Sequence, residues 1–253
     1  DRDWSSDVCS SDLFFVRHSQ LNQEIIMRLG TTTTLTHGVT AAASVTTTER
    51  LVFIKKVYSL LAMSMLTAAV GAYLGSGPLF LVVAPNMMLF FVLQIGLIFF
   101  ASFAARKPGL NIIALFSFTT VSGLTLGPML MRVGPTIAAE AFILTAITFV
   151  CLSLYVVYSK KDFSFMSGFL MTGLIVIVVG GLLNIFFIQS GMMHFVMSGA
   201  SVLLFSGFIL YDTSNILRYY GTDEHVSATL ALYLDVLNLF IALLSILGIM
   251  SDD

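Results

Sequence analysis

Charge is scarce in this sequence. Charged residues make up only 10% of the 253 residues, hydrophobic residues make up 57%, and the mean hydropathy is +0.96. Soluble domains are typically about one quarter charged. The composition therefore excludes a water-soluble globular protein and predicts an all-α integral membrane protein. The net charge of −2 also excludes the basic surface that proteins use to bind nucleic acid.

Cysteine and histidine are also few, and they are widely separated along the chain. The two cysteines form neither a disulfide framework nor a CxxC motif, and the four histidines form no metal-binding cluster. The sequence contains no GxSxG, no HExxH and no phosphate-binding glycine loop. We therefore expect neither enzyme activity nor an organic cofactor. The residues concerned are Cys9, Cys151, His18, His37, His194 and His225.

The first 48 residues differ in composition from the rest. The segments "DRDWSSDVCSSDL" and "TTTTLTHGVTAAASVTTT" are polar or low in complexity. Such segments cannot bury enough apolar surface to offset the entropy lost on ordering. We expect residues 1–48 to be a disordered or non-native polar tail. We also expect the first 20 or so residues to be a cloning or translation artefact, with the natural start at Met27.

Seven long apolar segments follow the tail, and each is long enough to cross a bilayer of about 30 Å. Short breaks rich in glycine, proline and polar residues separate them. The sequence therefore predicts a single seven-transmembrane-helix bundle over residues 49–253. The expected spans are 52–74, 79–104, 110–131, 136–158, 164–188, 193–219 and 226–250.

Basic residues predict the orientation of the bundle, because cytoplasmic loops carry an excess of lysine and arginine. Eight basic residues fall on one side of the membrane, and only Arg132 falls in the loops of the other side. We expect the N-terminus to be cytoplasmic and the C-terminus to lie outside. The eight are Arg50, Lys55, Lys56, Arg106, Lys107, Lys160, Lys161 and Arg218.

Two carboxylic acids fall within the last two apolar segments. Asp212 and Asp235 should lie at similar depth on neighbouring antiparallel helices joined by a short turn. Each is followed three residues later by an amide, Asn215 or Asn238, which places acid and amide on one helix face. Ionisable residues within a membrane are costly, and they commonly mark ion pathways, proton relays or ligand sites.

Two carboxyl groups in contact share a proton, because both cannot ionise cheaply at that distance. A shared proton would join the two helices by a hydrogen bond. Ionisation of both acids would separate them and attract a cation. This hypothesis makes Asp212 and Asp235 a pH sensor and gate, while a static polar contact between helices is the alternative.

Four further polar positions are candidates for a latch or a pore lining. Arg106 and Lys107 end the second span, where either could turn inward to the aspartates or anchor the helix at the interface. Gln94 lies near mid-membrane and can only coordinate or donate and accept hydrogen bonds. Glu140 lies near the outer end of the fourth span, at an outer mouth or at the interface.

Pairs of glycines spaced four residues apart predict close helix packing in the membrane. The segment "GAYLG" contains Gly71 and Gly75, and "GLTLG" contains Gly123 and Gly127. We interpret both as packing surfaces.

Several motifs together resemble one known family. They are "VSGLTLGP" (121–128), "KKDFSFMSGFL" (160–170), "LLNIFF" (182–187), "LYDTSNIL" (210–217) and "LYLDVLNLFIALLSILG" (232–248). The sequence is similar, from Glu49 to the C-terminus, to the Bax inhibitor family of transmembrane proteins, and specifically to its bacterial YccA-like branch.

The resemblance implies a bundle with one central helix, and it implies that Asp212 and Asp235 match the di-aspartyl pH sensor of the family. In that family the pair gates a calcium leak, so the two acids would bind calcium transiently. A basic residue ending the second span can latch onto the pair, and Arg106 is the match here. Family members often carry a glutamate where Gln94 stands.

Two functions follow as expectations. The first is a pH-sensitive calcium leak channel in a bacterial inner membrane, with the lipid bilayer and calcium or protons as partners. The alternative is a membrane binding module that modulates a membrane-embedded AAA protease, a role linked to the YccA-like branch. An intramembrane aspartyl protease is disfavoured, because "YLD" at 233–235 lacks the GxGD of that class.

Overall fold

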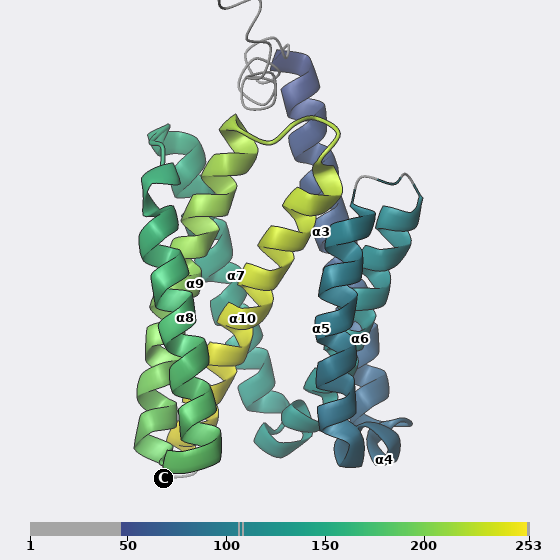
Figure 1. The fold of residues 1–253 in the computed structure, drawn as a ribbon, viewed down its shortest axis with the longest axis vertical. Coiled ribbons are helices and arrows are strands. Elements are labelled where there is room, and N and C mark those ends of the chain that lie inside the picture. The colour runs from purple at the N-terminus through teal and green to yellow at the C-terminus, as the bar shows by residue number, and fades with distance from the viewer. Residues whose placement is uncertain (1–46, 106, 108, 252–253) are drawn as a thin grey trace, which may run out of the picture. The chain divides into compact units, whose positions relative to one another are not determined.

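The computed structural model describes residues 47–105, 107 and 109–251, and these residues form helices without a strand (Figure 1). The predicted polar tail of residues 1–48 falls almost entirely outside the described residues, as does Arg106. Seven helical segments are long and apolar enough to cross a membrane. The predicted all-α membrane architecture is therefore confirmed.

The seven spans agree with the expected ranges to within a few residues. Five of them are single helices: α3 (Thr47–Ser76), α6 (Leu110–Val133), α7 (Pro135–Ser159), α9 (Gly191–Arg218) and α10 (His225–Ser251). The second span combines α4 (Phe80–Val83), η1 (Ala84–Asn86) and α5 (Met87–Ala104). The fifth combines η2 (Ser164–Met166), α8 (Ser167–Leu183) and η3 (Asn184–Ile188).

Local sequence explains the irregular turns in the second and fifth spans. Pro85 lies in the 3-10 turn η1, where its missing N–H and fixed φ suit a break in the helix. The π-helical turn η3 ends at Gln189, whose φ is +49°. The Asn184 side chain closes this turn by accepting a hydrogen bond from Ser190 N at 3.0 Å and donating one to Ser190 O at 3.2 Å.

Helices α3 and α6 pack through the two predicted glycine pairs. A Cβ atom added at Gly71 would lie 2.3 Å from the Thr120 carbonyl oxygen, and one added at Gly123 would lie 2.0 Å from the Ala68 carbonyl oxygen. No larger residue fits at such backbone separations. The interpretation of these glycines as packing surfaces is confirmed.

Helix α10 is the central helix of the bundle. It packs against α9, α3, α7 and α6, and it is the most buried of the seven spans. In Figure 1 it runs obliquely between α8 and α9 on one side and α3, α5 and α6 on the other. Its buried side chains include Leu232, Tyr233, Leu239 and Leu244. This arrangement agrees with the central helix that the family resemblance implies.

Candidate functional site

The carboxyl groups of Asp212 and Asp235 meet between α9 and α10. The two helices form an antiparallel hairpin with a turn at 219–224, and the acids lie within hydrogen-bonding reach of each other. Asp212 is 9% exposed and Asp235 only 5%. The spacing and depth of the two acids in the sequence predict this contact.

The surroundings of the two acids differ. The Asn215 side chain lies near the Asp212 carboxyl, as the i,i+3 spacing predicts. Among the residues that the structure describes, the Oδ2 atom of Asp235 has no hydrogen-bond partner although it is buried. An unsatisfied buried oxygen of this kind is costly, so Asp235 is the acid of the pair that keeps a free acceptor atom.

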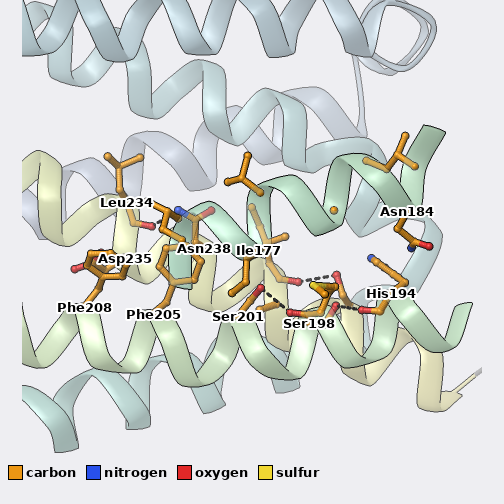
Figure 2. A pocket seen from close by; sticks show the side chains of 18 of the residues that line it. Ile177, Asn184, His194, Ser198, Ser201, Phe205, Phe208, Leu234, Asp235 and Asn238 are labelled. Atoms are coloured by element: carbon orange, nitrogen blue, oxygen red, sulfur yellow. Dashed lines mark hydrogen bonds between the residues drawn. The ribbon is translucent and has the colours of Figure 1, made fainter. Parts of the chain in front are cut away.

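A cavity of about 600 Å³ extends from the aspartate pair along α8, η3, α9 and α10. Figure 2 shows Asp235 and Phe208 at one end of the cavity, with His194 and Asn184 at the other end. Asp212 lies six residues before the end of α9, near the predicted cytoplasmic face. The opposite end of the cavity therefore points toward the predicted outer face.

The cavity wall is polar at its ends and apolar in its middle. On α9 the outer part carries His194, Ser198 and Ser201, and Phe205 and Phe208 separate them from Asp212. The two serine hydroxyls donate to backbone carbonyls of their own helix, at 2.9 and 2.8 Å. The two phenylalanines therefore form an apolar stretch of the wall between the serines and the carboxyl pair.

Asn238 is part of the same site because its side chain lines the cavity. Its Nδ2 donates to the Leu234 carbonyl oxygen at 2.7 Å, and the side chain lines the cavity beside Asp235. The amide oxygen is then the atom able to accept a hydrogen bond or contact a cation.

The other predicted latch and pore residues lie apart from the pair. Gln94 accepts a hydrogen bond at 3.1 Å from Thr125 Oγ1, which joins α5 to α6 outside this cavity. Glu140 is exposed on α7. The Lys107 ammonium lies 4.7 Å from the centroid of the Phe103 ring, so it contacts its own span. Arg106, the residue matched to the family latch, lies outside the described residues.

Arg50 contributes to the site in a way that the sequence did not suggest. Its Nε donates to the Leu217 carbonyl oxygen at 3.1 Å, and its Nη1 donates to the carbonyl oxygen of Tyr220. The Leu217 carbonyl belongs to the last turn of α9, where a cation is favoured, and Tyr220 lies in the turn that follows. Arg50 therefore fixes the turn between the two helices that carry the aspartates. The sequence indicated only that this arginine helps to set the orientation of the bundle in the membrane.

Tyr220, in the same turn, was also missed. Its burial, followed by the negative charges of Asp212 and Glu224, raises the pKa of the Tyr220 hydroxyl. The phenol therefore stays protonated and lies within electrostatic range of the carboxyl pair. An aromatic residue in an otherwise polar turn, "YGTDEH", is the signal that could have indicated a buried role.

A second cluster holds the α7–α8 connection against α9. Tyr219 donates its hydroxyl proton to Asp162 Oδ2, and Ser164 N donates to Asp162 Oδ1 at 2.9 Å. Arg218 donates to the Lys160 carbonyl oxygen. The hydrogen bond from Tyr219 is the main reason why the pKa of Asp162 lies below its ordinary value.

Most of the chain matches one family. The family described as "Inhibitor of apoptosis-promoting Bax1", the Bax inhibitor family, matches residues 50–252. The chain belongs to this family.

Relatives within the Bax inhibitor family come from bacteria and from a virus. A membrane protein of Vibrio cholerae is 44% identical over 209 residues, which cover 79% of this chain and 90% of that protein. The Escherichia coli protein named modulator of FtsH protease YccA is 37% identical over 204 residues, or 79% of this chain and 91% of that protein. The Golgi anti-apoptotic protein of vaccinia virus is 34% identical over 214 residues, which cover 83% of this chain and 90% of that protein.

The donor set of this Bax inhibitor family member fits weak rather than tight metal binding. Within the described residues, no three histidine, cysteine, aspartate or glutamate side chains converge to hold a metal ion. Calcium takes six to eight oxygen ligands, whereas the site offers two carboxyl groups and the Asn238 amide. A calcium ion here would need several water molecules, which the cavity has room for.

Proposed function

We propose that this protein is a pH-sensitive cation leak channel, with calcium as the favoured ion and Asp212 and Asp235 as its gate. The observation that carries the proposal is the contact of two buried acids at the inner end of a membrane-embedded cavity. The E. coli relative from strain O6:H1 is named an inner membrane protein, and we propose the same location here.

The gate would act through the proton that the two acids share. While the proton is present, one carboxyl group donates to the other and joins α9 to α10. When both acids are ionised, like-charge repulsion favours separation of the two helices. The separated carboxylates then attract a cation into the cavity. The turn held by Arg50 is the fixed end about which the helices would separate.

Calcium flux into liposomes tests the proposal directly. The full chain is reconstituted, a calcium indicator is enclosed, and the initial flux is recorded between about pH 6 and 8, the interval over which a shared proton could respond. Protein-dependent flux that changes with pH supports the leak. Flux equal to that of empty liposomes at every pH would contradict it.

The second candidate is a modulator of a membrane-embedded AAA protease. The name of the E. coli relative favours this function. Degradation of a membrane substrate by the protease is measured in the same liposomes, with and without this chain. Slower degradation in its presence, with the protease amount unchanged, supports modulation. An unchanged rate over a tenfold excess of the chain contradicts it.

A further inference from the structure

The cavity beside the aspartate pair is elongated. Its volume of about 600 Å³ lies within the range of about 300–1,000 Å³ typical of small-molecule sites. His194 and Asp212 line its two ends and lie about 27 Å apart along α9, at 1.5 Å per residue. This length suits a single extended chain better than a compact, rounded molecule.

The middle of the cavity offers an apolar surface to such a molecule. Side chains from three helices contribute to it, and none of the described lining residues is a lysine or an arginine. A hydrocarbon chain would contact side chains of all three helices. The apolar lining residues include Ile177, Val178, Phe205, Phe208, Leu234 and Ile241.

Two of the helices that line the cavity, α8 and α10, do not pack closely against each other. Helix α8 packs mainly against α9, and it is the least buried of the seven spans. No substantial packing joins α8 to α10 in the described part of the chain. A molecule dissolved in the hydrocarbon of the bilayer can therefore enter from the side, without crossing the polar turns.

The inner end of the cavity selects for positive charge. Asp235 lines the cavity, is only 5% exposed, and has an Oδ2 atom without a hydrogen-bond partner among the described residues. Asp212 and the Asn238 amide oxygen add acceptors beside it. An ammonium group has three donors and no acceptor, so it matches this end of the cavity.

We propose that the cavity between α8, α9 and α10 binds a lipophilic amine, with the protonated amine on Asp212 and Asp235 and its hydrocarbon chain along the apolar wall. This site shares the carboxyl pair with the proposed channel, but it does not depend on ion flux. The bound amine would occupy the position that a permeating cation needs.

Binding of radiolabelled dodecylamine to the full chain in lipid nanodiscs tests the proposal, with empty nanodiscs subtracted. Gly181 lines the cavity and has open space at its Cβ position, so Gly181→Leu fills the site. Gly96, on α5 outside the cavity, has the same open space, and Gly96→Leu is the matched control. Asp235→Asn removes the carboxylate with which the ammonium group of the amine would pair.

We expect saturable binding to the unchanged chain. Asp235→Asn removes the contact with the ammonium group and Gly181→Leu removes space for the hydrocarbon chain, so each should weaken binding at least about tenfold. Gly96→Leu should bind as the unchanged chain does, and dodecanol should not compete. Non-saturable binding, equal competition by dodecanol, or indifference to either cavity variant would overturn the proposal. Since no ion gradient is used, saturable binding without calcium flux would contradict only the channel, and flux without binding would contradict only this site.

Discussion

Arg50 Nε lies 3.1 Å from the backbone oxygen of Leu217, although the two residues are 167 positions apart in the chain. The bond connects the first turn of α3 to the last turn of α9, and a second bond from Arg50 reaches the Tyr220 carbonyl. The hairpin that carries both aspartates is therefore held at its turn by the first span.

Arg50→Gln should loosen this turn. The variant loses charge-assisted hydrogen bonds to two carbonyls, and we expect a loss of about 1.5–3 kcal/mol in the free energy of unfolding. Unfolding in mixed micelles, followed by circular dichroism, measures the change. Lys55→Gln is the control, because Lys55 is exposed on the same helix. Equal stability of the two variants would show that Arg50 only anchors the helix at the interface.

Tyr219→Phe should reduce the acid sensitivity that Asp162 gives to the folded state. The hydrogen bond from Tyr219 is the largest cause of the lowered pKa of Asp162. A lowered pKa in the folded state stabilises the fold above the ordinary aspartate value of about 3.9. This stabilisation is lost as the pH falls through the lower, folded-state value.

The stability difference between the unchanged chain and Tyr219→Phe should therefore be full at pH 5–6, and it should shrink as the pH falls below about 4. Thermal unfolding at a series of pH values measures it. Tyr158→Phe, at an exposed tyrosine near the end of α7, is the control. A difference that stays constant down to pH 2 or so would exclude Asp162 as the group involved.

Gly123→Ala should disrupt the packing of α3 on α6. The added Cβ would lie 2.0 Å from the Ala68 carbonyl oxygen, so the helices must separate, at a cost of about 1–3 kcal/mol or more. Gly96→Ala meets nothing within 4 Å and should be neutral or slightly stabilising, because alanine favours helix. Unfolding midpoints of the two variants compare the effects. A Gly123→Ala variant as stable as Gly96→Ala would contradict the observed approach of the helices.

Much of this architecture could be predicted from the sequence, because the bilayer imposes simple rules on length and polarity. The lengths of the apolar segments predicted the seven helices. The glycine spacing predicted close helix packing at the glycines that join α3 to α6, and the similar depth of Asp212 and Asp235 on antiparallel helices predicted their contact. Each of these features depends on residues that are close in sequence or repeat at a helical period.

The contacts that the sequence did not predict join residues far apart in the chain. Arg50 and Leu217 carry no local pattern that pairs them, and Tyr219 and Asp162 lie on different connections. The cavity depends on α8 packing against α9 and not closely against α10, which the apolar sequence of α8 does not specify. Gln94 was a candidate pore-lining residue because it lies near the middle of its span. In the structure its side chain instead accepts a hydrogen bond from Thr125.

The central claim is that the Asp212–Asp235 pair senses pH, and flux through the double variant Asp212→Asn, Asp235→Asn tests it most directly. Amides keep the size of the acids and cost less than carboxylates in the membrane, so the variant should still insert. Asp223→Asn, at an exposed acid in the α9–α10 turn, is the control. Calcium flux between about pH 6 and 8 should become independent of pH in the double variant and stay pH-dependent in the control. A double variant that inserts and keeps the pH dependence of the unchanged chain would contradict the claim and leave modulation of a membrane protease as the better account.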